Sequence, residues 1–275
     1  MNNLKLVKDP KYWLLAIAAS LITLHLHLSW RSENADLLGI SLLFWVAVSA
    51  LIWRKRDSLN LESEVFSTIF GALLIGFVLF KSTHLYGYDL FLRVSPFISI
   101  LGLSLLASGV KGLKQYWQEI LLVAFMAVPP GVLSIFIDLS LLTAKFASFV
   151  LWILGFQVSN SGVMVTLPTG GIKVGAGCDG FGIILQLLGL SFICLVMFGH
   201  HLWHRILVPI ASVILAFVVN GMRVALMAIL AALSNQEAFE YWHTGDGSLI
   251  FSMLAVFMFG VFCHFTVLRT AGARG

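Results

Sequence analysis

The 275-residue sequence is too apolar for a soluble protein, since 59% of its residues are hydrophobic and only 11% carry a charge. The net charge is only +4, and the lysines and arginines cluster at the ends of apolar runs, which excludes a nucleic-acid-binding surface. We therefore predict an all-α polytopic membrane protein, with residues 1–275 forming a single integral membrane domain.

Eight apolar runs are long enough to span a membrane, which takes roughly 20 predominantly apolar residues. The first run follows three lysines but ends without a small-residue cleavage pattern, so we predict a retained span and not a signal peptide. The connectors between the runs are short and mostly polar. The predicted spans are 12–30, 37–53, 65–81, 90–110, 118–137, 179–198, 206–233 and 247–268.

The cationic residues predict the orientation, because lysine and arginine accumulate on the cytoplasmic side of a membrane protein. With the N-terminus inside, eleven of the 17 lysines and arginines lie on the cytoplasmic side. An even number of spans returns the C-terminus to that side. We therefore predict cytoplasmic termini and a cytoplasmic loop 199–205, with segments 157–177 and 235–246 outside.

Residues 118–156 form a long apolar stretch that is broken by Pro129-Pro130-Gly131, so they could cross the membrane once or twice. Two crossings would give nine spans and would place the segment that follows inside. Asp138 and Lys145 are costly at membrane depth. We therefore predict one crossing followed by a helix, 138–156, that lies in the outer interface.

Segment 157–177 is predicted to be non-helical. Two β-prone runs, 163–167 and 172–174, flank the sequence Pro168-Thr169-Gly170-Gly171. Such runs around a glycine-containing turn predict a β-hairpin with short strands. The hairpin leads directly into a glycine-rich turn around Cys178.

Cys178 lies at the predicted start of the helix 179–198. Unpaired backbone amides at a helix start carry partial positive charge, which favours a thiolate and lowers a cysteine pKa. The neighbouring glycines would let a peptide approach the sulfur. We therefore predict that Cys178 is a nucleophile, the alternative being a small apolar side chain packed at a helix end. Cys194 and Cys263 lie within apolar spans and are expected to pack there.

Arg223 lies within the predicted span 206–233, where a guanidinium is costly unless it faces a partner or a wet cavity. This makes it a candidate functional residue, the alternative being an arginine that snorkels to the interface. Asn220 lies three residues earlier on the same helical face. His243, in the loop before the last span, is either an ordinary surface residue or an acid–base group, because histidine titrates near neutral pH.

The predicted topology places Cys178, Arg223 and His243 at one membrane depth on the outer face. A cysteine nucleophile, a histidine base and a cation that stabilises an oxyanion form a complete set for acyl transfer. Three histidines of the inner loop, His200, His201 and His204, have a spacing that suits metal binding, but no cysteine or carboxylate is near them. We predict that they are interfacial anchors, and we expect neither a metal nor a cofactor.

Four short motifs follow one another in a fixed order along the second half of the chain. Val128-Pro129-Pro130-Gly131 and Leu167-Pro168 come first, then Gly177-Cys178-Asp179-Gly180, then Asn220-Gly221-Met222-Arg223-Val224, with His243 and Gly247 after them. This order resembles the exosortase/archaeosortase family of membrane-embedded cysteine transpeptidases. The resemblance covers residues 115–268 as an exosortase-like catalytic core, while the spans of residues 1–114 agree only in general character.

The resemblance implies an enzyme of the cytoplasmic (inner) membrane with its active site on the extracytoplasmic face. By position, Cys178 matches the nucleophile, Arg223 the arginine and His243 the histidine of the family. The implied partners are membrane lipids and secreted proteins that end in a PEP-CTERM-like sorting tail, with a motif such as Pro-Glu-Pro, a transmembrane helix and a basic cluster. Such enzymes cut near the motif through a thioester and can pass the new carboxyl terminus to an acceptor.

One residue departs from the family pattern, because Asp179 stands where the family has serine or alanine after the cysteine. An adjacent carboxylate would raise the thiol pKa, or it could orient His243. This departure leaves the subfamily and the substrate motif open.

Two other functions compete with the peptidase. The first is a transporter or channel in which Arg223 binds an anion near a broken helix, although no repeat relates the two halves of the sequence. The second is a structural subunit in which Arg223 pairs with a partner helix. Labelling of Cys178 by a thiol-reactive probe from outside would favour the peptidase.

Overall fold

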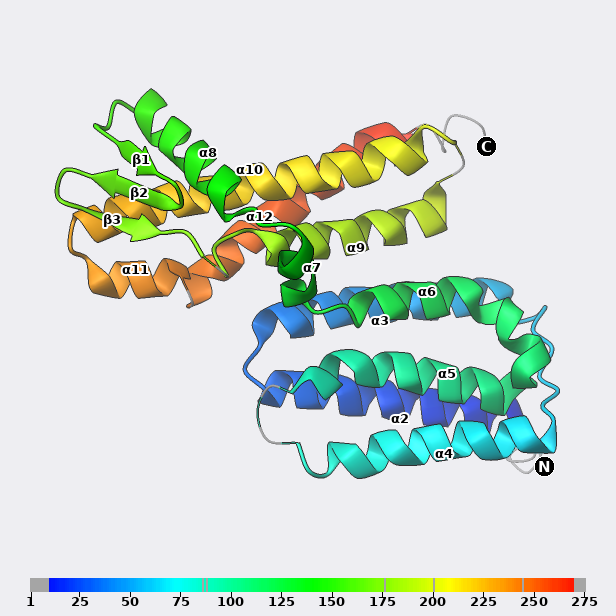
Figure 1. The fold of residues 1–275 in the computed structure, drawn as a ribbon. Helices are drawn as coiled ribbons and strands as arrows, with labels where there is room; N and C mark the ends of the chain where they lie inside the picture. The colour runs from blue at the N-terminus through cyan, green and yellow to red at the C-terminus, as the bar shows by residue number, and fades with distance from the viewer. Residues whose placement is uncertain are drawn as a thin grey trace. The chain divides into compact units, whose positions relative to one another are not determined.

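The computed structural model describes residues 10–85, 87, 89–175, 177–199, 201–243 and 245–269. The chain forms two compact units, Met1–Pro129 and Pro130–Gly275. The described part of the first unit is helical, and the second combines helices with a small antiparallel sheet (Figure 1).

Seven helical stretches among the described residues are long and apolar enough to cross a membrane. The predicted class, an all-α multi-pass membrane protein, is therefore confirmed. The stretches are Pro10–Arg31, Asp36–Lys55, Val65–Ser82, Leu90–Met126, Phe181–Phe198, His204–Ala232 and Gly247–Leu268.

The predicted span 118–137 is not one helix. Helix α6 (Trp117–Met126) ends before Pro129, and helix α7 (Pro130–Phe136) begins after it. Proline has no backbone N–H and disfavours the helical conformation in the residue before it, so Pro129 and Pro130 interrupt the hydrogen-bond ladder. Pro130 then occupies the first position of α7, where a missing N–H does no harm.

In the first unit, helices α4 and α5 approach each other closely through two glycines. A Cβ added to Gly71 would lie 2.6 Å from the carbonyl oxygen of Gly102, and one added to Gly102 would lie 3.0 Å from the carbonyl oxygen of Gly71. Small residues at such a crossing let two membrane helices pack backbone to backbone. The helices of this unit are α2 (Pro10–Arg31), α3 (Ala35–Lys55), α4 (Val65–Ser82), α5 (Leu90–Gly112), the 3₁₀ turn η1 (Leu113–Tyr116) and α6.

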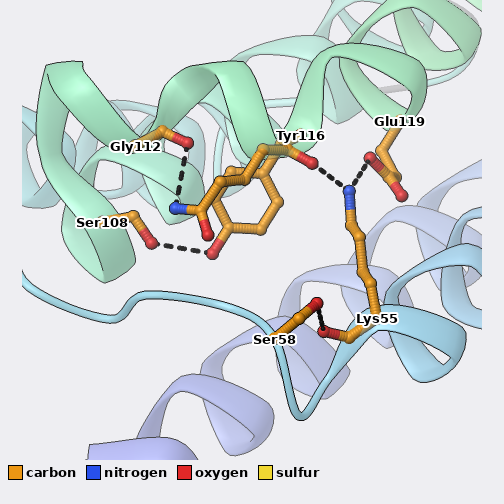
Figure 2. Close-up of polar contacts among 7 residues, drawn as sticks. Lys55, Ser58, Ser108, Gly112, Tyr116 and Glu119 are labelled. Atoms are coloured by element: carbon orange, nitrogen blue, oxygen red, sulfur yellow. Dashed lines mark hydrogen bonds and ion pairs between the residues drawn. The ribbon is translucent and has the colours of Figure 1, made fainter.

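An ion pair between a half-buried lysine and a buried glutamate joins α3 to α6 at the bend that follows α5 (Figure 2). The Nζ of Lys55 donates to Oε2 of Glu119 at 2.7 Å and also to the backbone carbonyl of Gln115. Glu119 is completely buried. Next to the pair, the hydroxyl groups of Ser108 and Tyr116 lie 2.9 Å apart. This polar cluster fixes the end of α3 against the turn between α5 and α6.

The second unit is built around the long helix α10, which packs against α8, α9, α11, α12 and two strands of the sheet (Figure 1). Its elements are α7, α8 (Ser140–Ile153), β1 (Ser159–Ser161), β2 (Met164–Leu167), β3 (Gly170–Lys173), α9 (Phe181–Phe198), α10 (His204–Ala232), α11 (Gln236–His243), α12 (Asp246–Cys263) and the π-helical η2 (His264–Leu268).

The predicted hairpin is confirmed as the antiparallel pair β2–β3, in which Leu167 faces Gly170 across a two-residue turn. Strand β1 adds to the outer edge of β2, and its sequence Ser-Asn-Ser has no apolar residue that could have predicted it. Val165 and Ile172 point into a core that they share with α8 and α10. The sheet therefore covers one end of α10.

Helix α8 corresponds to the predicted interfacial helix 138–156. Its 14 residues extend about 21 Å at a rise of about 1.5 Å per residue, less than the roughly 30 Å of a bilayer core. One face, including Ala144 and Ala147, packs in the core, whereas Trp152 and Ile153 are exposed. A second full crossing by α8 is therefore not supported.

Candidate active site

Cys178 lies in a turn that precedes α9. The helix begins at Phe181, after Gly180, whose φ of +97° is the left-handed conformation that glycine adopts most readily. The backbone N–H of Cys178 donates to the carbonyl of Gly175 at 2.9 Å. The predicted helix start at residue 179 is therefore too early, and Cys178 does not lie on the first amides of the helix.

The thiol of Cys178 is buried in the core between the sheet and α10. It shares a cluster with Val165 of β2 and Val224 of α10, and Trp242 packs against this cluster. Burial raises the pKa of the Cys178 thiol, the charge of Arg223 opposes this rise, and the charge of Asp179 adds to it. The prediction of a lowered thiol pKa is wrong, because desolvation outweighs the nearby positive charge.

Asp179 holds the turn in place through two contacts. Its Oδ1 accepts a hydrogen bond from the backbone N–H of Phe181 at 3.1 Å, and its carbonyl accepts one from Oγ1 of Thr143 at 3.0 Å. Burial raises the pKa of the Asp179 carboxyl group, and the hydrogen bond from Phe181 opposes this rise. The carboxylate raises the thiol pKa as expected, but among the described residues no hydrogen bond joins it to His243, and it accepts from the N–H of Phe181 at the start of α9 instead.

Asn220, on α10, holds the backbone of Cys178. Its Nδ2 donates to the carbonyl of Cys178 at 2.9 Å, and its side chain packs against Gly180. Asn220 is only 1% exposed, and its buried Oδ1 has no hydrogen-bond partner among the described residues. Within that part of the chain, the amide donates one hydrogen bond and accepts none.

Arg223 lies one turn further along α10 and is only 7% exposed. Its Nε donates to the carbonyl of Trp242 at 3.1 Å, and its Nη2 donates to the carbonyl of His243 at 2.5 Å. These carbonyls lie at the end of α11, where carbonyl groups have no partner within the helix and carry partial negative charge. Arg223 is thus a buried, hydrogen-bonded residue, which does not fit the alternative of an arginine that snorkels.

His243 is the last residue of helix α11, whereas the sequence predicted a loop at 235–246. The helix forms because Oδ1 of Asn235 accepts a hydrogen bond from the N–H of Ala238 at 3.0 Å, as a helix N-cap does. The half-buried imidazole of His243 lies 5.3 Å from the ring of Phe239, one turn earlier. Through its carbonyl, His243 is connected to Arg223.

The structure connects the predicted residues in two groups. Asn220 donates to the backbone of Cys178, which precedes Asp179, and Arg223 donates to the backbone of His243. The charges of Arg223 and Asp179 both act on the Cys178 thiol. No hydrogen bond between the imidazole and the thiol is present among the described residues. Nothing in the sequence indicated Thr143, which supports Asp179 from α8, because its contact joins distant parts of the chain.

Comparison with known proteins assigns the chain to a family. A family model described as transmembrane exosortase matches residues 10–260. The chain belongs to the transmembrane exosortase family. The match includes the N-terminal spans of this exosortase, beyond the range 115–268 that the sequence motifs covered. No curated protein and no solved structure matches the chain.

Two glycines in the sequence motifs let the helices around the candidate site pack closely. A side chain at Gly221 would collide with the ring of Phe146, so this glycine lets α8 approach α10. A Cβ on Gly247 would lie 2.7 Å from the ring of Tyr241 and 2.8 Å from that of Trp242. Gly247 therefore lets the end of α11 pack closely against α12.

The three histidines at 200–204 were predicted to be interfacial anchors. Of these, His204 is buried, and its Nε2 lies 3.1 Å from the carbonyl oxygen of Thr266. His200 lies outside the described residues. Within the part of the chain that the structure describes, no group of three or more histidine, cysteine, aspartate or glutamate side chains could hold a metal.

Proposed function

We propose that this chain is a membrane-embedded cysteine peptidase or transpeptidase that cuts the C-terminal sorting tails of secreted proteins. The observation that carries the proposal is the position of Arg223, which holds the end of α11 that bears His243 and whose charge acts on the Cys178 thiol. Membership of the exosortase family supports the general activity, and the contacts of Asn220 and Arg223 support a site at Cys178 and His243.

In the proposed reaction, the sulfur of Cys178 attacks the carbonyl carbon of the scissile peptide bond. His243 takes the thiol proton and later gives it to the amine that leaves with the tail. The C–N bond breaks and a thioester forms between Cys178 and the client. Water or another nucleophile then attacks the thioester and releases the client with a new carboxyl end, and the thiol is restored.

The buried thiol explains why this reaction needs a base. Because burial raises the pKa of Cys178, the resting sulfur is a neutral thiol at neutral pH and the proton must be removed during attack. The positive charge of Arg223 favours the thiolate and would also stabilise the negative charge that develops on the client's carbonyl oxygen. Both effects are stronger in a site that excludes water than in solution.

We further propose that the site faces the extracytoplasmic side of the cytoplasmic (inner) membrane, with both termini in the cytoplasm. The client class is a secreted protein with a PEP-CTERM-like tail, whose own transmembrane helix would bring its motif to the outer face. A transporter with an anion site at Arg223 is not proposed, because the chain belongs to the exosortase family.

The test is cleavage of a reporter protein that ends in a Pro-Glu-Pro motif, an apolar helix and a basic cluster, in membranes that contain the enzyme. Cys178→Ala should abolish cleavage and Cys178→Ser should be nearly as damaging, because a serine hydroxyl is far less acidic than a thiol. The variants Cys194→Ala and Cys263→Ala are the matched controls and should cleave normally. Normal cleavage by Cys178→Ala, at equal protein level, would refute the proposal.

A further inference from the structure

One turn of α10 touches both segments that carry the proposed reacting groups. Asn220 donates to the backbone of Cys178 in the turn before α9, and Arg223 donates to the backbone of Trp242 and His243 at the end of α11. The two side chains are three positions apart and therefore lie on one face of the helix. Both grip main-chain carbonyl groups, so each fixes the path of a segment.

We infer that this turn sets the position of Cys178 relative to His243, and that Asn220 and Arg223 are positioning residues for the reaction. The inference rests on the proposed function, since it assigns these residues a part in that same site. Proton transfer needs the base within roughly 2.6–3.2 Å of its partner atom, directly or through one water. Segments that are far apart in sequence reach such precision only when a rigid element holds both of them.

The state of the Asn220 amide argues that the residue does more than fill space. Its Nδ2 donates a hydrogen bond, but its buried Oδ1 has no partner in the part of the chain that the structure describes, and such a buried acceptor destabilises a folded protein. A leucine of similar shape would remove this unsatisfied acceptor and would also leave the carbonyl of Cys178 without its donor. Because the two effects on stability oppose each other, Asn220→Leu should change the stability little while it releases the Cys178 turn.

Arg223 acts on the Cys178 thiol by its charge and holds the end of α11 by its hydrogen bonds, and a substitution by lysine tests these two effects separately. A lysine keeps the positive charge near Cys178 but has no planar fork that could donate to two consecutive carbonyls in fixed directions. Arg223→Lys should therefore leave the thiol pKa nearly unchanged while it loosens the end of α11.

The experiment measures the position of Cys178 relative to residue 243 by chemical cross-linking, without relying on catalysis. In a background with Cys194→Ser and Cys263→Ser, the His243→Cys variant places a second thiol at the end of α11, where the proposed reaction needs a group that faces Cys178. A short bis-maleimide should join the two thiols within the molecule, and labelling by a single maleimide corrects for the reactivity of each thiol. Asn220→Leu and Arg223→Lys should each lower the corrected yield of this cross-link by about fivefold or more.

Met222 supplies the matched control, because it lies in the same turn of α10 but is 50% exposed on the other side. Met222→Leu should leave the cross-link yield unchanged. In the enzyme with its native His243, Asn220→Leu should lower kcat for the reporter by about 10- to 100-fold at unchanged KM and unchanged thermal unfolding. If the leucine variant fails to insert, Asn220→Ala, which only removes atoms, takes its place.

Unchanged cross-link yields in both Asn220→Leu and Arg223→Lys would overturn the inference. This failure is distinct from failure of the proposed function, which would show as normal cleavage by Cys178→Ala. A loss of kcat that merely follows a loss of thermal stability would equally reject a positioning role for Asn220.

Discussion

At the scale of single residues, the Cys178 thiol is controlled by one dominant effect and two charges of opposite sign. Burial between the sheet and α10 raises its pKa, Arg223 opposes this rise and Asp179 strengthens it. At rest the chain thus holds a neutral thiol. In the proposed reaction, activation depends on the base and on the charge of Arg223, which favours the thiolate only where a proton acceptor is in place.

The two charges predict opposite shifts of the thiol pKa. In a background with Cys194→Ser and Cys263→Ser, the alkylation rate of Cys178 by iodoacetamide should be measured against pH. Removing the negative charge in Asp179→Asn should lower the thiol pKa, so the profile moves to lower pH. Removing the positive charge in Arg223→Gln should raise the thiol pKa and move the profile to higher pH.

Met222→Leu again serves as the control for this experiment, since it changes no charge and lies in the same helix. A shift in the same direction for Asp179→Asn and Arg223→Gln would show that the variants act by changing the burial of the thiol and not by their charge. The pH at which cleavage reaches half its maximum should move in the same sense as the alkylation profile for Asp179→Asn.

The sequence located the important side chains better than it described their surroundings. Arg223 and Asn220 could be singled out because a buried arginine in an apolar span is costly and helical spacing places Asn220 on its face. The environment of Cys178 could not be read in the same way. Its burial depends on Val165 and Trp242, which come from other parts of the chain, and its helix starts late because Gly180 takes a left-handed conformation.

At the scale of the elements, hydropathy identifies the long helices, since a lipid environment demands that each spanning segment satisfies its own backbone hydrogen bonds. It fails where helices are short or polar. Helix α11 was expected to be a loop, because it is only eight residues long and its start depends on the Asn235 cap. The prolines at 129–130 were visible in the sequence, but only the structure shows that they divide the apolar run into α6 and α7.

In the first unit, Lys55 pairs with the completely buried Glu119, and we predict a large loss of stability when the lysine is removed. Lys55→Met would leave the completely buried Glu119 without its counter-charge, which should lower the free energy of unfolding by about 3–5 kcal/mol. The exposed pair of Lys111 and Glu64 has the same separation of 2.7 Å and is the matched control. Lys111→Met should have little effect, because water screens exposed charges.

The stability of Lys55→Met and of Lys111→Met is measured by thermal unfolding in detergent. A fluorogenic maleimide that reacts with newly exposed cysteines follows the unfolding. The double variant Lys55→Met/Glu119→Leu should recover most of the stability that Lys55→Met loses, because it leaves no unpaired charge. Equal losses for Lys55→Met and Lys111→Met would contradict the assignment of a buried pair.

The contact between α4 and α5 gives a second prediction at this scale. Gly71→Ala would push a methyl group against the backbone of Gly102, so the unfolding temperature should fall, with a loss of about 1–3 kcal/mol. Gly76 lies on the same helix with open space around it, and Gly76→Ala should be neutral or stabilising, because alanine favours the helix. The same unfolding assay compares the two variants, and an equal response from both would reject close packing at Gly71.

At the scale of the whole molecule, all the proposed site residues belong to the second unit, Pro130–Gly275, although the family match begins at residue 10. The first unit contributes no residue to the proposed chemistry. Composition alone was enough to predict a multi-pass membrane protein, because the low content of charged residues leaves no soluble surface. The division of the chain at Pro129 could not be predicted in this way, since it depends on which helices pack together.

The membrane sides of the loops carry the last prediction. Helices α9 and α10 separate the Cys178 turn from α11, and two crossings return the chain to the side from which it started. Cys178 and His243 therefore share a side whatever the absolute orientation is, as the contacts of Asn220 and Arg223 require. The absolute side depends on whether the short helices between residues 117 and 137 complete a crossing.

The distribution of lysine and arginine predicts that the segment between residues 117 and 137 completes a crossing. The site would then lie outside and both termini inside. The test uses single cysteines introduced by Ser159→Cys, Leu202→Cys and Glu237→Cys, all at exposed positions, in a background where the three native cysteines are replaced. A maleimide that cannot cross the membrane should label the first and third variants in intact cells, and the second only after permeabilisation. Labelling of the second alone would reverse the orientation and keep the shared site, whereas opposite sides for the first and third would rule out any reaction that joins Cys178 to His243.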